Sequence, residues 1–221
     1  MEVSFTDVLE KAAQLQEVIP GAVLVGGSAA AVHAHHRESL DNDHVVDDLE
    51  NRFDAILENL EALGDWSMAR AQPGKIILGE LGGIETGVRQ LLRSRPLETE
   101  EMQLRGKRLV VPTAEEILRI KAWLTLSRNQ TRDYLDVAAL AERIGLDQAA
   151  KMLTAIDDYY ADVNRRPEAV VTQLVRQLSD PRPRDSQVTK QLSRYKELEE
   201  RWHNWAAVKT VLGGLAERMS A

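Results

Sequence analysis

Two carboxylates separated by a single residue are the side chains of this sequence best suited to chemistry. Asp41 and Asp43 flank Asn42, and on an extended strand alternate side chains project from the same face. Two carboxylates that close repel each other unless a cation neutralises them, and hard oxygen ligands suit Mg²⁺ or Mn²⁺. The pair therefore predicts a divalent metal site, although the same D-x-D pattern also occurs in solvated turns and at helix starts.

A glycine-rich turn, Gly26-Gly27-Ser28, precedes the two aspartates. A helix that opens at such a turn offers backbone N–H groups and the positive end of its dipole to a phosphate. A phosphate-binding turn beside a metal site is the arrangement that nucleotidyl transfer requires. The alanine-rich segment after the turn also carries His33, His35 and His36, which allow either a transition-metal site or ordinary packing.

A second charged segment begins at Lys121. Lys121 and Arg128 fall on one face of a predicted helix, where they could hold a triphosphate and stabilise charge on a leaving pyrophosphate. Asp133 could orient one of these cations or act as a base on an incoming hydroxyl. The alternative is an ordinary surface ion pair between Arg132 and Asp136, which are four residues apart.

Together the two segments resemble the nucleotidyltransferase superfamily and, within it, the AbiEii/MenT-like toxin branch. The string VGGSAAAVHAHHRESLDND, which ends at Asp43, is similar to the branch's GG-S/T turn, helix and H-R-x-S-x-D-x-D segment. The string IKAWLTLSRNQTRDYLDVAAL, which contains Lys121, is similar to its second motif, a lysine followed by R-x-x-K/R-D-x-x-D. The resemblance covers residues 20–145, approximately.

The resemblance implies a metal-dependent enzyme that moves an NMP from an NTP to an acceptor. It implies Mg²⁺ or Mn²⁺ as cofactor, tRNA as a candidate acceptor, and a toxin–antitoxin or defence setting with a cognate antitoxin as partner. It assigns catalysis to Asp41, Asp43, Lys121 and Asp133, nucleotide binding to Gly26, Gly27, Ser28, Arg128 and Arg132, and the metal to Asp41, Asp43 and a third carboxylate, Glu85.

The sequence departs from that pattern around its aspartates. The branch usually has apolar residues between and after the two aspartates, whereas this chain has Asn42 and His44. Glu85 shares a predicted strand face with Arg89, which could neutralise it instead. The alternative function is therefore a catalytically degenerate nucleotide-binding or protein-interaction module of the same fold.

The elements that must position these residues are predicted from apolar spacing and turn residues. Helical spacing covers 5–18 and 46–63, and short strands are expected near 22–25 and 41–45. Hairpin turns are expected at Pro73-Gly74, Gly82-Gly83 and Arg105-Gly106 in a β-rich stretch. The pattern is helical after Pro112. We predict an α+β fold, in which a small nucleotidyltransferase-type mixed β-sheet with flanking helices precedes a helical C-terminal half.

Three domains are expected: an α/β core at 1–112, a helical domain at 113–180, and a linker with a helical tail at 181–221. The linker is the proline-rich string DPRPRDS, which begins at Asp180. An apolar stripe from Val188 to Met219 predicts one long helix, or two if Gly213-Gly214 interrupts it. This stripe could pack into the core, form a homodimer seam, or bind a partner.

Composition excludes several classes of protein. The chain has no cysteine, which removes disulfides, thiolate catalysis and cysteine-type zinc sites. The net charge is −7, which disfavours broad non-specific nucleic-acid binding. Eight basic and five acidic residues give the tail +3, so the acidic charge lies in the body. The absence of a long apolar run and of a signal-like start predicts a cytoplasmic protein without membrane contact.

Overall fold

The computed structural model of the protein describes residues 3–221 and separates into two compact units. Unit 1 comprises the chain up to Ala29 together with Ser39–Thr113. Unit 2 comprises Ala30–Glu38 and Ala114–Ala221. Unit 1 contains the β-structure with its helices and unit 2 is helical, which confirms the predicted α+β class.

A five-stranded mixed sheet forms the centre of unit 1, with the strand order β1-β2-β5-β4-β3. The strands are β1 (Val23–Leu24), β2 (Asn42–Val46), β3 (Trp66–Gln72), β4 (Ile76–Leu81) and β5 (Ile84–Gln90). β2 and β5 are parallel neighbours, whereas the other pairs are antiparallel. The turns between β3, β4 and β5 fall at the two glycine-containing pairs that predicted hairpins.

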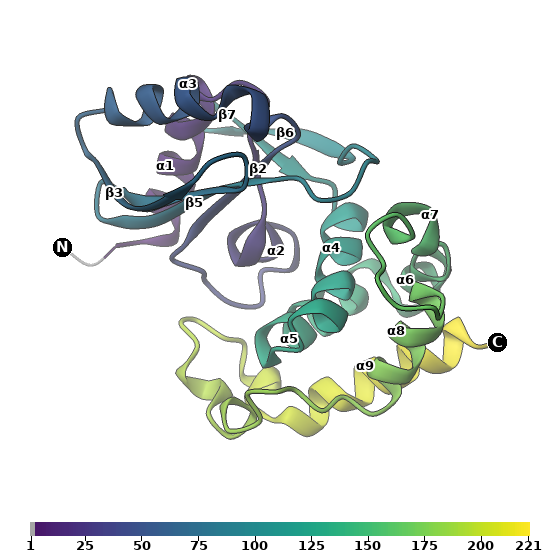
Figure 1. Ribbon diagram of the computed structural model, residues 1–221. Helices are drawn as coiled ribbons and strands as arrows, with labels where there is room; N and C mark the ends of the chain where they lie inside the picture. Colours follow the sequence, from purple (N-terminus) through teal and green to yellow (C-terminus); the bar gives the residue numbers. More distant parts are fainter. Residues whose placement is uncertain (1–2) are drawn as a thin grey trace. The chain divides into compact units, whose positions relative to one another are not determined.

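Helices α1 (Phe5–Val18) and α3 (Leu49–Glu61) cover one face of this sheet (Figure 1). Leu15 of α1 and Ile56 of α3 join Val46 and Val88 of the sheet in one buried apolar cluster. α1 begins at the predicted residue because Ser4 and Asp7 form a reciprocal capping box, which satisfies N–H groups that the first turn leaves without acceptors.

A separate hairpin completes unit 1. It consists of β6 (Thr99–Leu104) and β7 (Lys107–Pro112), joined at the predicted Arg105-Gly106 turn. The Gln16 side chain of α1 donates to the Val110 carbonyl at 2.8 Å and accepts from the Val110 N–H at 2.7 Å. This amide pairs with β7 as a neighbouring strand would, and so ties the hairpin to α1.

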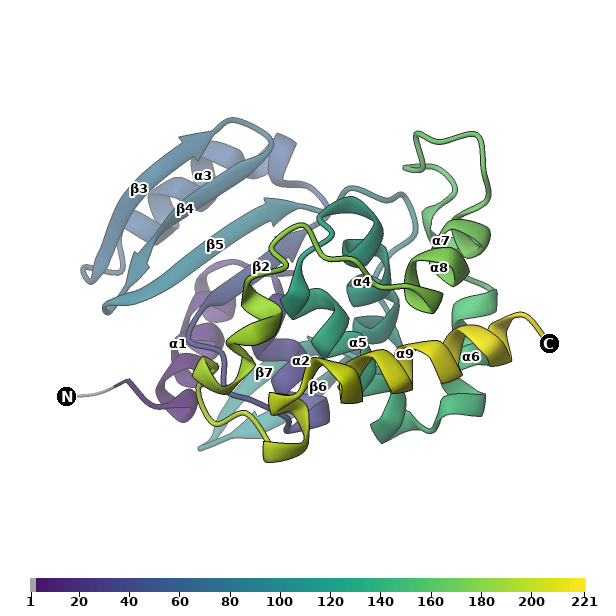
Figure 2. The same ribbon diagram turned by 90° about the horizontal axis from the view of Figure 1, so that it is seen from below.

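Helix α2 (Gly26–Ala34) begins in unit 1, and its residues from Ala30 onward are grouped with unit 2. The other helices of unit 2 are α4 (Ala114–Ser127), α5 (Thr131–Ile144), α6 (Leu146–Thr154), α7 (Asp157–Tyr160), α8 (Val170–Ser179) and α9 (Trp205–Met219). α9 runs beside α5, α6 and α8 (Figure 2) and buries Val208, Leu212 and Leu215. None of the helices in residues 3–221 has the length and apolarity needed to cross a membrane.

The tail differs from the single long helix that its apolar spacing predicts. Within residues 181–204 the tail forms three short 3₁₀ helices, Val188–Lys190, Leu192–Arg194 and Glu200–His203. These turns bury Leu192, Leu198 and Trp202, and successive short turns give the same spacing of three and four as a helix. Gly213-Gly214 lie inside α9 and do not interrupt it. Residues 147–160, which lie in the stretch predicted to be helical, are divided between α6 and α7.

Candidate functional site

Asp43, the second residue of β2, projects into a space that two glycines leave open. Gly87 is its partner on β5, and a Cβ at Gly87 would lie 3.2 Å from Asp43 Oδ1. Gly26 has a φ of +72°, and a Cβ there would lie 2.9 Å from Asp43 Oδ2. A side chain at Gly26 would therefore displace the carboxylate, and one at Gly87 would crowd it. The Asp43 side chain is 33% exposed.

The start of α2 lies against the same carboxylate. Gly26 is the first residue of α2, and the first N–H groups of a helix have no acceptor inside it. The Val25 N–H donates to the Asp43 carbonyl at 2.7 Å. The buried Ser28 hydroxyl donates to the Asp41 carbonyl at 2.6 Å. Ser28, predicted to hold phosphate, thus fixes the backbone of the first aspartate in this structure, and the helix N-terminus meets Asp43 directly.

The two unexpected polar residues of β2 point to the opposite, buried face of the sheet. Asn42 has no exposed surface and its amide donates to the Val8 carbonyl of α1 at 3.0 Å. His44 is fully buried, and burial lowers its pKa to about 4 against the opposing effect of Asp43. His44 is therefore neutral near pH 7, and both departures from the family pattern serve packing in unit 1.

The cation beside Asp43 is Arg89, which the sequence pairs with Glu85 as an alternative. Arg89 Nε lies 3.6 Å from Asp43 Oδ1. Asp41 and Glu85 are exposed, and Glu85 is opposite Glu80 of β4. Within residues 3–221, no group of three or more His, Cys, Asp or Glu side chains is placed to hold a metal ion.

The donor chemistry on this face nevertheless fits one kind of divalent cation. Mg²⁺ commonly binds one or two protein carboxylates, several waters and the phosphates of a substrate, without a cage made only of protein. Asp43, half-exposed beside a helix N-terminus, offers such a partial site, and Asp41 is two residues away. The partial site therefore suits a divalent cation that is already bound to the phosphates of a substrate.

A buried charged cluster in unit 2, the Asp136 cluster, consists of His36, Arg37, Lys121, Asp133 and Asp136. Asp136 accepts from His36 Nε2 at 2.8 Å and from Arg37 Nε at 2.9 Å and Nη2 at 3.1 Å. It also forms an ion pair with Lys121 Nζ at 2.7 Å. Burial would raise the pKa of Asp136, but Arg37, Lys121 and His36 hold it well below the usual range. The alternative, a surface ion pair between Arg132 and Asp136, therefore does not form, because Asp136 has no exposed surface.

Asp133 is the under-satisfied member of the cluster. It has no exposed surface, neither carboxylate oxygen has a hydrogen-bond partner among the described residues, and Lys121 Nζ lies 3.7 Å from its Oδ1. Burial raises the pKa of Asp133, and Lys121 offsets this only in part. Of the other predicted cations, Arg128 is half-buried and Arg132 is exposed.

The tail contributes residues to this cluster that the sequence did not single out. Tyr195 places its ring 5.6 Å from the Arg37 guanidinium carbon. The Glu38 N–H donates to the Lys196 carbonyl and the Glu199 N–H to the His36 carbonyl, both at 2.9 Å. The tail therefore holds the His36-Arg37 turn in place. The H-R string was visible in the sequence, but nothing local marks its partners in the tail.

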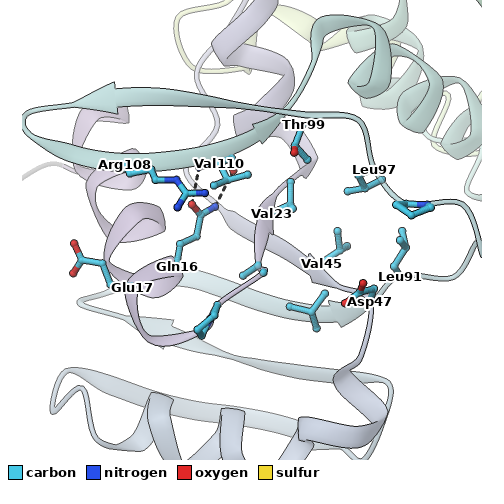
Figure 3. Close-up of a pocket in the computed structure, with 15 residues that line it drawn as sticks. Gln16, Glu17, Val23, Val45, Asp47, Leu91, Leu97, Thr99, Arg108 and Val110 are labelled. Carbon is cyan, nitrogen blue, oxygen red and sulfur yellow. Dashed lines mark hydrogen bonds between the residues drawn. The ribbon is translucent and has the colours of Figure 1, made fainter.

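A pocket of ≈ 480 Å³ opens elsewhere in unit 1, between the β1–β2 edge and the β6–β7 hairpin (Figure 3). Its walls are mainly aliphatic, with Val23, Val45 and Val110 beside the Gln16 amide, and Asp47 lies at its edge. None of the predicted site residues lines it. No local sequence pattern marks this pocket, and Asp43 is not among the residues that line it.

Comparison with solved structures identifies the fold. The chain superposes on the antibiotic-resistance factor ANT(2'')-Ia with a TM-score of 0.55 and 13% identity, over 74% of this chain and 96% of that one. A Helicobacter pylori protein assigned as a nucleotidyltransferase matches with a TM-score of 0.52 and 16% identity, over 97% of this chain and 93% of that one. The chain has a nucleotidyltransferase fold.

The curated relatives are much longer proteins. The sequence is 39% identical over 112 residues to the heme uptake protein MmpL11 of Mycobacterium tuberculosis, covering 48% of this chain and 11% of that protein. It is 42% identical over 94 residues to the mycolic acid-containing lipids exporter MmpL11 of Mycolicibacterium smegmatis, covering 42% of this chain and 10% of that protein. The chain thus matches about a tenth of their length. No protein-family model matches the sequence.

Proposed function

We propose that the protein is a nucleotidyltransferase that moves an NMP from an NTP to a hydroxyl or phosphate of an acceptor. The observation that carries the proposal is the meeting of Asp43 with the N-terminus of α2, where a Cβ at Gly26 would touch the carboxylate. A cation ligand and an anion-binding helix start stand side by side, as a metal-bound triphosphate requires. The adenylyl-2''-tobramycin bound to ANT(2'')-Ia, a neighbour with a TM-score of 0.52, makes a hydroxyl acceptor reasonable.

Unit 1 would bind the triphosphate. The backbone N–H groups of Gly26 and Gly27 would hold phosphate oxygens, and Ser28 would keep the Asp41 backbone in place. Asp41 and Asp43 would hold Mg²⁺ or Mn²⁺, with Glu85 as the proposed third carboxylate. The cation, when bound, supplies positive charge against the charge that builds on the transferring phosphoryl group.

The segment of the second motif would supply the cations and the base. Arg128 and Arg132 would contact the nucleotide, and Lys121 would stabilise charge on the leaving pyrophosphate. Asp136 fixes Lys121 through the 2.7 Å contact. Asp133 would accept the proton of the incoming hydroxyl, because a carboxylate whose pKa is raised by burial is a better base near neutral pH.

The acceptor, the biological setting and the partner are proposed from the resemblance to the AbiEii/MenT-like branch. The acceptor would be tRNA, the setting a toxin–antitoxin or defence system, and the partner a cognate antitoxin. A homodimer through the tail is not favoured, because the apolar residues that would form its interface are buried within unit 2. They include Leu192, Trp202 and the apolar residues of α9.

The test is transfer of label from NTPs to a tRNA pool in the presence of Mg²⁺. Asp43→Asn should reduce transfer about a hundredfold or more. Asp54→Asn makes the same chemical change at an exposed position of α3 and should leave transfer unchanged. No transfer by the wild type, or equal transfer by Asp43→Asn, would contradict the proposal.

A second candidate, a non-catalytic nucleotide-binding or interaction module, is favoured by two observations. Arg89 lies beside Asp43, and residues 3–221 contain no group of three or more His, Cys, Asp or Glu placed to hold a metal ion. The sequence also matches a segment of large transport proteins. Such a module would serve a longer partner protein. Calorimetry separates the two: NTP binding that is indifferent to Mg²⁺ and survives Asp41→Ala supports the module.

A further inference from the structure

Arg89 is the cationic neighbour of Asp43 among the described residues. The two side chains project from adjacent parallel strands, with Arg89 Nε 3.6 Å from Asp43 Oδ1. That separation exceeds hydrogen-bond length, and Arg89 Nε has no hydrogen-bond partner in residues 3–221. Asp43 and Arg89 therefore attract each other by charge and do not form a hydrogen bond.

A glycine next to both side chains leaves the space beside Asp43 and Arg89 unfilled. Gly87 lies between Glu85 and Arg89 on the same strand face, and a Cβ there would lie 3.2 Å from Asp43 Oδ1 and 4.0 Å from Arg89 Nε. Both side chains are about one-third exposed, at 33% for Asp43 and 39% for Arg89. The space beside Asp43 is thus shared between a fixed positive charge and any cation that enters from solvent.

We propose that Arg89 is a built-in counter-cation of Asp43 that suppresses binding of a free divalent cation at this face. The proposal rests on Asp43 being the cation ligand of the proposed function. A guanidinium near the carboxylate both neutralises the ligand and repels the incoming ion. A cation carried by a nucleotide meets less repulsion, because the phosphates offset its charge and supply further oxygen ligands. Arg89 thus makes the site selective for the cation–nucleotide complex over the free ion.

The experiment measures Mn²⁺ binding to the full chain without nucleotide, from the electron paramagnetic resonance signal of free Mn²⁺ at low ionic strength. Arg89→Gln should bind Mn²⁺ about tenfold more tightly than the wild type. The difference should shrink as salt is added, because both side chains are partly exposed. Arg70→Gln makes the same charge change on the exposed strand β3 and should alter the affinity less than about twofold.

Three results would overturn the proposal. Arg89→Gln could bind no more tightly than the wild type. Arg70→Gln could raise the Mn²⁺ affinity as much as Arg89→Gln, which would show that the net charge alone causes the effect. The gain could also survive in Arg89→Gln/Asp43→Asn, which would place the ion elsewhere. Circular dichroism confirms that each variant is folded. Since no nucleotide is used, these outcomes are decided independently of whether the protein transfers an NMP.

Discussion

Mild acid should destabilise the protein through His44, a residue of strand β2 that takes no part in the proposed chemistry. His44 has no exposed surface, and neither ring nitrogen has a hydrogen-bond partner among the described residues. Burial lowers its pKa from 6.5 to about 4. The unfolded chain therefore binds the proton more tightly than the folded chain. Stability is fully present above pH 6.5 and falls as the pH falls from there toward 4.

The magnitude follows from these two pKa values. With 6.5 for the unfolded chain and about 4 for the folded chain, the linkage relation gives a loss of about 2 kcal/mol between pH 7 and pH 5. Asp133 acts in the opposite direction, because a raised pKa in the folded state stabilises at low pH and the benefit is lost as pH rises. Comparing the wild type with a His44 variant at each pH removes that contribution, which both chains share.

The assay is urea unfolding followed by circular dichroism at pH 7, 6 and 5. His44→Leu should lose about 2 kcal/mol less stability than the wild type between pH 7 and pH 5, because leucine has no proton to gain. His203→Leu, which removes an exposed histidine, should follow the wild type. Parallel pH profiles for the wild type and His44→Leu would refute the reasoning.

Three further substitutions probe the rest of the structure. Asp136→Ala should cost about 3–5 kcal/mol in urea unfolding, because it leaves two buried cations without their carboxylate; a loss below about 1 kcal/mol would contradict the buried cluster. Gly26→Ala should weaken NTP binding in calorimetry much more than Gly83→Ala, because both have positive φ but only the first Cβ would meet a carboxylate. Asp185→Ala should lower stability by about 1 kcal/mol, because its carboxylate accepts from the N–H and hydroxyl of the first residue of α5; unchanged unfolding would show that this cap contributes nothing.

Local patterns predicted much of unit 1. The Ser4–Asp7 capping box set the start of α1, and the Pro73-Gly74 and Gly82-Gly83 turns set the hairpins. Each depends on residues a few positions apart, whose preferences act before tertiary packing. The pairing of Asp43 with Gly87 joins distant segments, so the sequence could name the aspartate but not its neighbour.

Burial of charge was the main feature that the sequence could not show. A carboxylate four residues from an arginine is typical of a solvated helix face, yet Asp136 is buried with partners from two other segments. The proline-rich segment that was predicted as a linker buries Pro181 and Pro183, and Asp185 caps α5. Both arrangements depend on the tail packing against the helices, which leaves no local signal.

The central claim, transfer of an NMP, is tested most directly by comparing the position of the label in the NTP. With Mg²⁺ and a tRNA pool, label at the α-phosphate should appear on the acceptor, and label at the γ-phosphate should appear only in released pyrophosphate. Asp43→Asn should abolish both signals. Transfer of the γ-label to the acceptor, or no transfer of the α-label beyond that of Asp43→Asn, would contradict the account.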